Sequence, residues 1–297
     1  MKMVFTGSSG QLASAMRQQR LVNGESLHFV GRPEVDLCYP ERVRKAILEH
    51  QPDIVVAAAA MTDVDAAERD PPLAKRINVE GQRAVADAAK ILSIPIIYLS
   101  SNYVFNGQLN TPYEETDSAY PLSVYGRTKL EGESVVAETN QKHVILRAGW
   151  IFSPTGRNFV KTVLDWAETR NECEIAVDRL GNPTAALDVA EVIMSVSRRL
   201  QRDSRPELYG TFHVASEGFC SLDEFAREII KVSTNIAGPQ LHVRNVRSTR
   251  FSTVASRPVN GCLATRKLKQ CFGIELPPWR QSVAKTVTLI LDERRRR

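Results

Sequence analysis

Tyr125 and Lys129 are the two residues whose types and spacing most directly suggest chemistry. They lie four positions apart in a stretch that predicts a helix, so they would share one face of it. A phenol has an ordinary pKa of about 10. A neighbouring ammonium lowers that pKa toward the range that proton transfer to a carbonyl requires. The alternative is a surface helical turn in which the tyrosine packs and the lysine is solvated.

A glycine turn follows the first predicted strand, residues 2–5. The spacing of Gly7, Gly10 and Ala13 is G-x-x-G-x-x-A. In dinucleotide-binding proteins such glycines permit a tight turn and a close approach of backbone to phosphate, and the alanine lets the next helix pack on the strand. A glycine-serine turn with no ligand is the alternative. A P-loop is excluded because no G-K-[ST] follows.

The following strands end in residues suited to a ligand. Arg32 stands after the second predicted strand, where NAD-binding proteins usually carry a carboxylate, and its charge suits a 2′-phosphate. A solvated turn arginine explains it equally well. The third strand runs into Ala57, Ala58, Ala59 and Ala60, whose small side chains leave room for a ligand. The fourth, 95–101, ends in two serines.

Strand and helix patterns alternate every 20 to 30 residues over the first half of the chain. This alternation predicts an α/β fold with a doubly wound parallel sheet of the Rossmann type. We expect residues 1–150 to form the dinucleotide-binding domain, with 184–215 returning to it. Residues 151–183 and 216–297 then form a smaller, partly irregular C-terminal substrate-binding subdomain. Asp65 with Glu68, and Ser221 with Glu224, have the spacing of helix capping boxes.

The composition of the 297 residues is that of a globular protein, with 43% hydrophobic and 25% charged residues. Four of the five net positive charges come from arginines 294–297, which predict a frayed, solvated tail and no nucleic-acid site. The five cysteines lack any C-x-x-C pair, which favours reduced thiols and a cytoplasmic location. No apolar run is long enough to span a membrane, so we expect no membrane partner.

Together these motifs resemble the extended short-chain dehydrogenase/reductase superfamily. The residues that support the resemblance extend over nearly the whole chain: 10–12, 52–55, 62–68, 101–107, 125–129 with 132–133, 147–150, 156 with 158–159, 181 with 183–184, and 257–258. The resemblance is closest to members that reduce the C4 keto group of a nucleotide-linked 6-deoxysugar.

The resemblance implies a role for each matching residue. Tyr125 would protonate the carbonyl oxygen, Ser101 would donate a hydrogen bond to it, and Lys129 would hold the nicotinamide ribose. NADPH is the expected coenzyme, with NADH as the second option. Its expected contacts are Gly7, Ser9, Gly10, Gln11, Leu12, Arg32, Asp36, Leu37, Ala58, Ala59, Tyr125 and Lys129. The expected substrate contacts are Ser101, Asn102, Val104 and Trp150, with Trp150 either the floor for the sugar ring or a core tryptophan.

Several positions depart from the family pattern. Asn102 replaces a usual carboxylate, Met61 replaces an aromatic residue, and Ala57 replaces an asparagine. Some members bind magnesium through a glutamate at the position of Ala15, so we expect no metal here. A homodimer is compatible with the resemblance. These departures affect the choice of substrate more than the type of reaction.

Two alternatives remain open from the sequence. Similar chains serve as non-catalytic regulatory subunits, such as the β subunit of methionine adenosyltransferase, and others are sugar-nucleotide epimerases or dehydratases. Trp150, the segment 156–159 and the complete set of serine, tyrosine and lysine favour the reductase.

Overall fold

Six parallel strands form the central sheet, which confirms the predicted doubly wound fold. The structure is a computed structural model that describes residues 1–296. The strand order is β10-β5-β4-β3-β1-β2, so β1 lies next to the edge strand β2 and the chain then continues on the other side of β1 through β3, β4, β5 and β10. The strands are β1 (Lys2–Thr6), β2 (Ser26–Val30), β3 (Ile54–Ala57), β4 (Ile96–Ser101), β5 (His143–Ala148) and β10 (Gly210–Val214).

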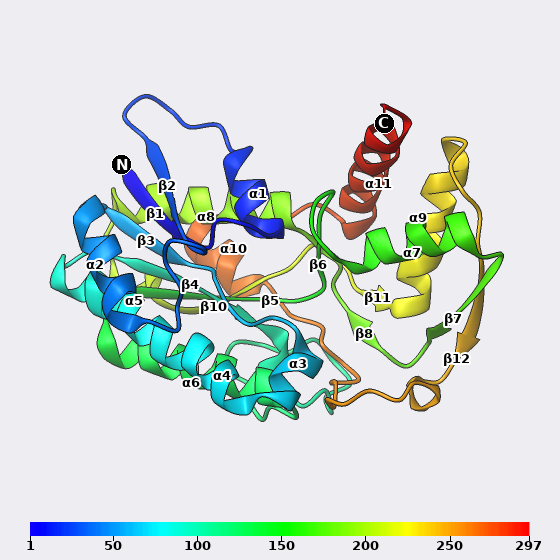
Figure 1. The fold of residues 1–297 in the computed structure, drawn as a ribbon, viewed down its shortest axis with the longest axis horizontal. Helices are drawn as coiled ribbons and strands as arrows, with labels where there is room; N and C mark the ends of the chain where they lie inside the picture. The colour runs from blue at the N-terminus through cyan, green and yellow to red at the C-terminus, as the bar shows by residue number, and fades with distance from the viewer. Residues whose placement is uncertain (297) are drawn as a thin grey trace.

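Helices cover both faces of this sheet, because alternate strand residues point to opposite sides (Figure 1). Met3 and Phe5 pack with α1 (Gln11–Arg17) and α8 (Ala186–Leu200) in one core cluster. Val4 packs on the other face with α2 (Pro40–His50), α5 (Gly81–Ile91) and α6 (Val124–Thr139). Strands buried on both faces explain the continuous apolar runs in the sequence.

The connection from β3 to β4 is broken into successive helical segments. It contains α3 (Val64–Arg69), α4 (Pro71–Lys75), a π-helical turn η1 (Arg76–Glu80) and α5. The predicted capping box of Asp65 and Glu68 is wrong, because Asp63 caps α3 and accepts from the Ala66 amide. The N-cap therefore lies two residues earlier than the pattern suggested, and both acids are free to bind other segments.

A smaller second body packs beside the carboxyl ends of the strands, on the right of Figure 1. Its own hydrophobic core joins three helices and several short strands. Ser221 and Glu224 form the predicted capping box at the start of α9. The elements are β6 (Ile151–Phe152), α7 (Phe159–Thr169), β7 (Glu172–Ala176), β8 (Leu180–Gly181), β9 (Thr184–Ala185), β11 (Cys220–Ser221), α9 (Leu222–Asn235), β12 (His242–Val246) and α11 (Trp279–Arg296). Short 3-10 turns are η2 (Asn102–Val104), η3 (Pro206–Leu208) and η4 (Ser248–Arg250).

The chain passes repeatedly between the two bodies. Ala185 belongs to the second core and Ala186 to the first. The helix α10 (Arg266–Phe272) packs against β10 through Leu268, so this segment lies in the first body and not in the subdomain where the sequence predicted it. The predicted domain division otherwise stays a prediction.

The C-terminal arginines are also ordered differently from expectation. Arg294 pairs with Asp165 and with Glu168, the latter at 2.6 Å, so α11 is tied to α7 instead of ending in a frayed tail. Arg297 lies outside the described residues.

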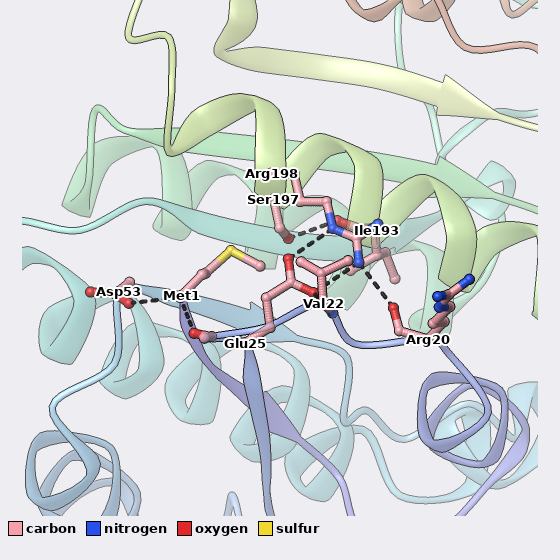
Figure 2. A network of polar contacts seen from close by, with 9 residues as sticks. Met1, Arg20, Val22, Glu25, Asp53, Ile193, Ser197 and Arg198 are labelled. Carbon is pink, nitrogen blue, oxygen red and sulfur yellow. Dashed lines mark hydrogen bonds and ion pairs between the residues drawn. The ribbon is translucent and has the colours of Figure 1, made fainter.

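A polar network joins the loop that precedes the edge strand β2 to α8 (Figure 2). Both carboxylate oxygens of Glu25 accept from Arg198, each at 2.8 Å, and Arg198 also donates to the Arg20 carbonyl oxygen. This hydrogen-bonded arginine lowers the pKa of Glu25 to about 2. The Met1 ammonium donates to the Gly24 carbonyl oxygen at 2.6 Å. The long loop before β2 is therefore held at both its ends.

Within residues 1–296, no helix is both long and apolar enough to cross a membrane.

Candidate active site

One large cavity, of about 740 Å³, runs along the carboxyl ends of β1 to β5, where open α/β sheets bind ligands. Its size is in the range of small-molecule and cofactor sites. The cavity brings together all twelve residues predicted to contact the coenzyme and three of the four predicted to contact the substrate. The shared lining comprises Gly7, Ser9, Gly10, Gln11, Leu12, Arg32, Asp36, Leu37, Ala58, Ala59, Ser101, Asn102, Tyr125, Lys129 and Trp150.

The glycine turn forms one end of the cavity. Gly7 and Gly10 have φ angles of 98° and 105°, in the region that favours glycine, so both positions require this residue type. The Gly7 amide donates to the Val30 carbonyl oxygen at 2.7 Å, which locks the turn to β2. At Gly7 and Gly10 the backbone therefore borders the cavity without a side chain of its own.

The adjoining wall is built from small residues at the end of β3. Thr6 Oγ1 accepts from the amides of Ala58 and Ala59, at 3.0 and 3.1 Å, and holds this segment beside the turn. Arg32 is exposed and lines the same region, and its carbonyl oxygen accepts from Ser8 Oγ at 2.7 Å. A planar ring could lie against the alanines with a cation at its edge.

Tyr125 occupies the opposite end of the cavity. It lies in the first turn of α6, whose N-cap Ser123 accepts from the Gly126 amide. Burial raises the pKa of the Tyr125 phenol to about 12, while a hydrogen bond with Ser101 opposes the rise. The direction is opposite to the sequence prediction, because desolvation outweighs any lowering by a neighbouring ammonium. The phenol therefore keeps its proton at neutral pH.

Lys129 lies on the same face of α6, with only 2% of its surface exposed. Its Nζ donates to the Leu99 carbonyl oxygen at 2.6 Å and lies 4.1 Å from the centre of the Tyr98 ring. Burial lowers the pKa of Lys129 to about 7, partly offset by Glu133. Near neutral pH this lysine can therefore hold or release a proton.

A buried ion pair lies one helical turn below Lys129. Glu133 accepts from Arg147 Nε at 2.9 Å and from Nη2 at 2.6 Å, and both side chains are more than nine-tenths buried. Ser100 Oγ also donates to Glu133. The pair links α6 to β4 and β5 beneath the site, and it supplies the negative charge that favours protonated Lys129.

Trp150 follows β5 with a φ angle of 47°. Its ring is stacked on Phe225, with centroids 6.2 Å apart and planes at 14°, and it also lines the cavity. Gly181 lies directly against the indole, since a Cβ there would be 2.5 Å from a ring carbon. The tryptophan thus packs against the second core and also lines the cavity, and its role as a floor for the sugar ring stays a prediction.

Asn102 has a bridging contact that the sequence did not reveal. Its Nδ2 donates to the Gly261 carbonyl oxygen at 2.8 Å, and only 1% of the residue is exposed. The amide that replaces the family's carboxylate therefore joins η2 to the second body.

The prediction for the Val104 side chain is wrong. Val104 is fully buried and packs with Phe105 and Tyr113, away from the cavity lining, because the 3-10 turn η2 directs it into the core.

A second bridge, between α3 and residues 255–257, was missed by the sequence reasoning. Asp65 accepts from Arg257 Nη2 at 2.7 Å and from the Ala255 amide at 3.0 Å. The arginine lowers the pKa of this carboxyl, and Arg257 also bonds to the half-buried Tyr103. Asp65, which the sequence predicted to cap a helix, thus forms a contact between the two bodies. Helical spacing alone could not show this contact.

Among residues 1–296, no group of three or more histidine, cysteine, aspartate or glutamate side chains is arranged to hold a metal ion. The expected absence of a metal stays a prediction.

Comparisons with known proteins agree with this geometry. Residues 1–291 match the family model described as RmlD substrate binding domain. The dTDP-4-dehydrorhamnose reductase of Sinorhizobium fredii is 41% identical over 293 residues, covering 99% of each chain. A structure of the reductase of that name from Clostridium acetobutylicum has a TM-score of 0.90 at 32% identity, covering 98% of this chain and 100% of that one. The Bacillus anthracis enzyme, solved in complex with NADP, has a TM-score of 0.89 at 30% identity, covering 97% and 99%.

Proposed function

Because the chain belongs to the RmlD substrate binding domain family, within the extended short-chain dehydrogenase/reductase superfamily, we infer that it is a dTDP-4-dehydrorhamnose reductase. The reaction is the NAD(P)H-dependent reduction of the C4 keto group of a dTDP-linked 6-deoxysugar, in dTDP-L-rhamnose biosynthesis. The observation that best supports this function is the single cavity that contains the glycine turn at one end and Tyr125 at the other.

The cavity fits a dinucleotide. Its glycine turn offers bare backbone to a pyrophosphate, and the alanines 58–60 form a wall for the adenosine. When bound, the coenzyme supplies a hydride. We assign Arg32 to the 2′-phosphate, because it is the exposed cation at that end and no carboxylate occupies its place. A charge-assisted bond there favours NADPH over NADH.

Tyr125 acts as the proton donor in this proposal. The ketone gains a hydride at carbon and a proton from the phenol at oxygen, so that an alcohol and a phenolate result. A phenol with a pKa raised to about 12 holds its proton until the oxygen of the substrate becomes basic. Ser101, hydrogen-bonded to Tyr125, orients the phenol and donates to the same oxygen.

Lys129 stabilises the phenolate that remains. Its ammonium is on the same helix face as Tyr125, and Glu133 favours the protonated form. With a pKa of about 7, it can then receive a proton from solvent and pass one back toward Tyr125. This cycle restores the phenol for the next turnover.

Trp150 provides the wall nearest the sugar ring. Its stacking on Phe225 and its contact with Gly181 fix the indole plane, which is what a rigid platform for an apolar sugar face requires. Asn102 contributes by keeping the second body in register with the site.

The decisive experiment measures loss of reduced-nicotinamide absorbance with purified protein and dTDP-4-dehydrorhamnose. We expect turnover with this substrate, and faster turnover with NADPH than with NADH at equal concentration. A panel of UDP- and GDP-linked 4-keto-6-deoxysugars tests the nucleotide. The variant Tyr125→Phe, which lacks the proposed proton donor, is the matched control.

A non-catalytic regulatory subunit would give a different result. It would bind NADPH in calorimetry yet show no turnover with any sugar on the panel, and that outcome would contradict the proposed function. The homodimer stays a prediction, which light scattering coupled to gel filtration can measure.

A further inference from the structure

Three cationic side chains line the cavity: Arg32, Lys129 and Arg157. The proposed function uses the first at the adenosine end and the second at the nicotinamide end. Arg157 has no role so far. It is exposed, and among residues 1–296 no carboxylate lies within 4.0 Å of its guanidinium.

Arg157 belongs to the second body but lies at the glycine turn of the first. It precedes Asn158, the N-cap of α7, so its backbone is anchored at the start of that helix. The preceding residue, Gly156, has a φ angle of 72° and touches the turn, since a Cβ there would be 3.0 Å from Gln11 Cγ. The loop that carries Arg157 is therefore packed directly on the turn.

Gln11 supplies an independent sign that a donor belongs at this place. Its Oε1 is buried and has no hydrogen-bond partner among the described residues. Buried acceptors are normally satisfied, and a guanidinium has five N–H donors that it can divide between two acceptors.

The glycine turn itself lacks a cation. Residues 7–11 contain none. The nearby Arg17 is already occupied, because its Nη2 donates to the Ser8 carbonyl oxygen at 2.6 Å and its guanidinium lies 4.0 Å from the centre of the Phe29 ring. Arg17 is also absent from the cavity lining. A doubly charged pyrophosphate on this turn would have backbone amides on one side and Arg157 on the other.

We propose that Arg157 binds the pyrophosphate of the coenzyme, with Gln11 Oε1 orienting its guanidinium. The inference rests on the proposed function, since it takes a nicotinamide dinucleotide as the ligand. It adds that the second body, and not only the Rossmann domain, holds the coenzyme. The pyrophosphate then joins the two bodies, so coenzyme binding prepares the site for the sugar nucleotide.

The test measures equilibrium dissociation constants by calorimetry for NADPH, NADH and adenosine 2′-phosphate, which lacks a pyrophosphate. We expect Arg157→Ala to weaken the binding of NADPH and of NADH by the same factor, about tenfold to hundredfold for the loss of a charge-assisted bond. Binding of adenosine 2′-phosphate should not change. Arg157→Lys should recover part of the affinity. The matched control is Arg83→Ala, which removes an exposed arginine of α5 outside the cavity.

Arg32→Ala separates this inference from the assignment of the 2′-phosphate, because it should weaken NADPH and adenosine 2′-phosphate but leave NADH unchanged. The inference is overturned if Arg157→Ala binds both coenzymes within twofold of wild type. It is also overturned if that variant loses affinity for adenosine 2′-phosphate by the same factor as for the coenzymes, since the loss would then come from a general distortion of the site. If wild-type protein binds neither coenzyme, the proposed function fails first and the inference falls with it.

Discussion

Replacing Lys129 by methionine should stabilise the protein at neutral and acidic pH while abolishing its activity. In the structure the lysine is buried and its pKa is lowered from 10.5 to about 7. Unfolding returns the ammonium to water and restores the ordinary pKa. Between pH 7 and 10.5 the unfolded chain therefore binds more protons than the folded one, so wild-type stability rises with pH across this window.

The size of the stability change follows from the same shift in the pKa of Lys129. At about 1.36 kcal/mol per pH unit, the burial of the charge costs roughly 4–5 kcal/mol below pH 7 and nothing above pH 10.5. Methionine removes that cost at all pH values. It also leaves the Leu99 carbonyl oxygen without its donor, which costs about 1–3 kcal/mol regardless of pH. We therefore expect Lys129→Met to be about 1–4 kcal/mol more stable than wild type at pH 6, and less stable at pH 10.

Urea denaturation at pH 6, 7, 8, 9 and 10 measures this crossing. The control Lys142→Met removes an exposed lysine that likewise donates to a backbone carbonyl oxygen, at 2.9 Å, and so reports the loss of such a bond alone. Stability curves for Lys129→Met and wild type that run parallel from pH 7 to 9 would refute the reasoning, because they would mean that burial does not shift the pKa of Lys129.

Four further changes test other parts of the molecule. Tyr125→Phe should reduce turnover by about 10² to 10⁴ with NADPH affinity within twofold, and a rate within threefold of wild type would exclude the phenol as acid. Trp150→Ala should weaken sugar-nucleotide binding by about 1–3 kcal/mol in calorimetry, against no change for coenzyme; equal weakening of both would contradict a sugar platform. Asn102→Asp should destabilise the fold by about 1–3 kcal/mol, because a carboxylate cannot donate to the Gly261 carbonyl oxygen, and an unchanged urea midpoint would count against the bridge. Glu25→Gln should lower the free energy of unfolding by about 2–3 kcal/mol above pH 4.5 and by nothing near pH 2, because the arginine partner lowers the pKa of Glu25 and the stability that the pair supplies is lost as the pH falls. A stability difference between variant and wild type that stays constant with pH would argue against that pair.

Features that depend on local spacing could be predicted from the sequence. The strand–turn–helix pattern around Gly7 and Gly10, and the four-residue separation of Tyr125 and Lys129, are encoded within single elements. The parallel sheet then brings the ends of separate strands to one edge, so fifteen residues predicted to contact coenzyme or substrate line one cavity. Predicting them required no knowledge of long-range packing. The roles assigned to these residues stay proposals.

Features that depend on burial or on distant partners could not be predicted. The rise in the Tyr125 pKa comes from desolvation by burial in the folded chain, whereas the sequence shows only the nearby lysine. Asp65 has capping spacing, yet its partner is Arg257, far along the chain. Val104 follows the site serine closely, but the 3-10 turn directs its side chain into the core. In each case a tertiary contact outweighs the local pattern.

The repeated passage of the chain between the two bodies has a practical consequence for dissecting the protein. A fragment that ends at residue 150 would lack α8 and β10, which would uncover part of one face of the sheet and leave β5 as an unprotected edge strand. Such an edge is a template for aggregation. The second body alone would be made of separate pieces, since its core draws on segments before and after α8 and also on α11 at the far end of the chain. We therefore expect no single cut to release an autonomously folding half, and two-fragment reporters built from this chain should fold only after the fragments combine.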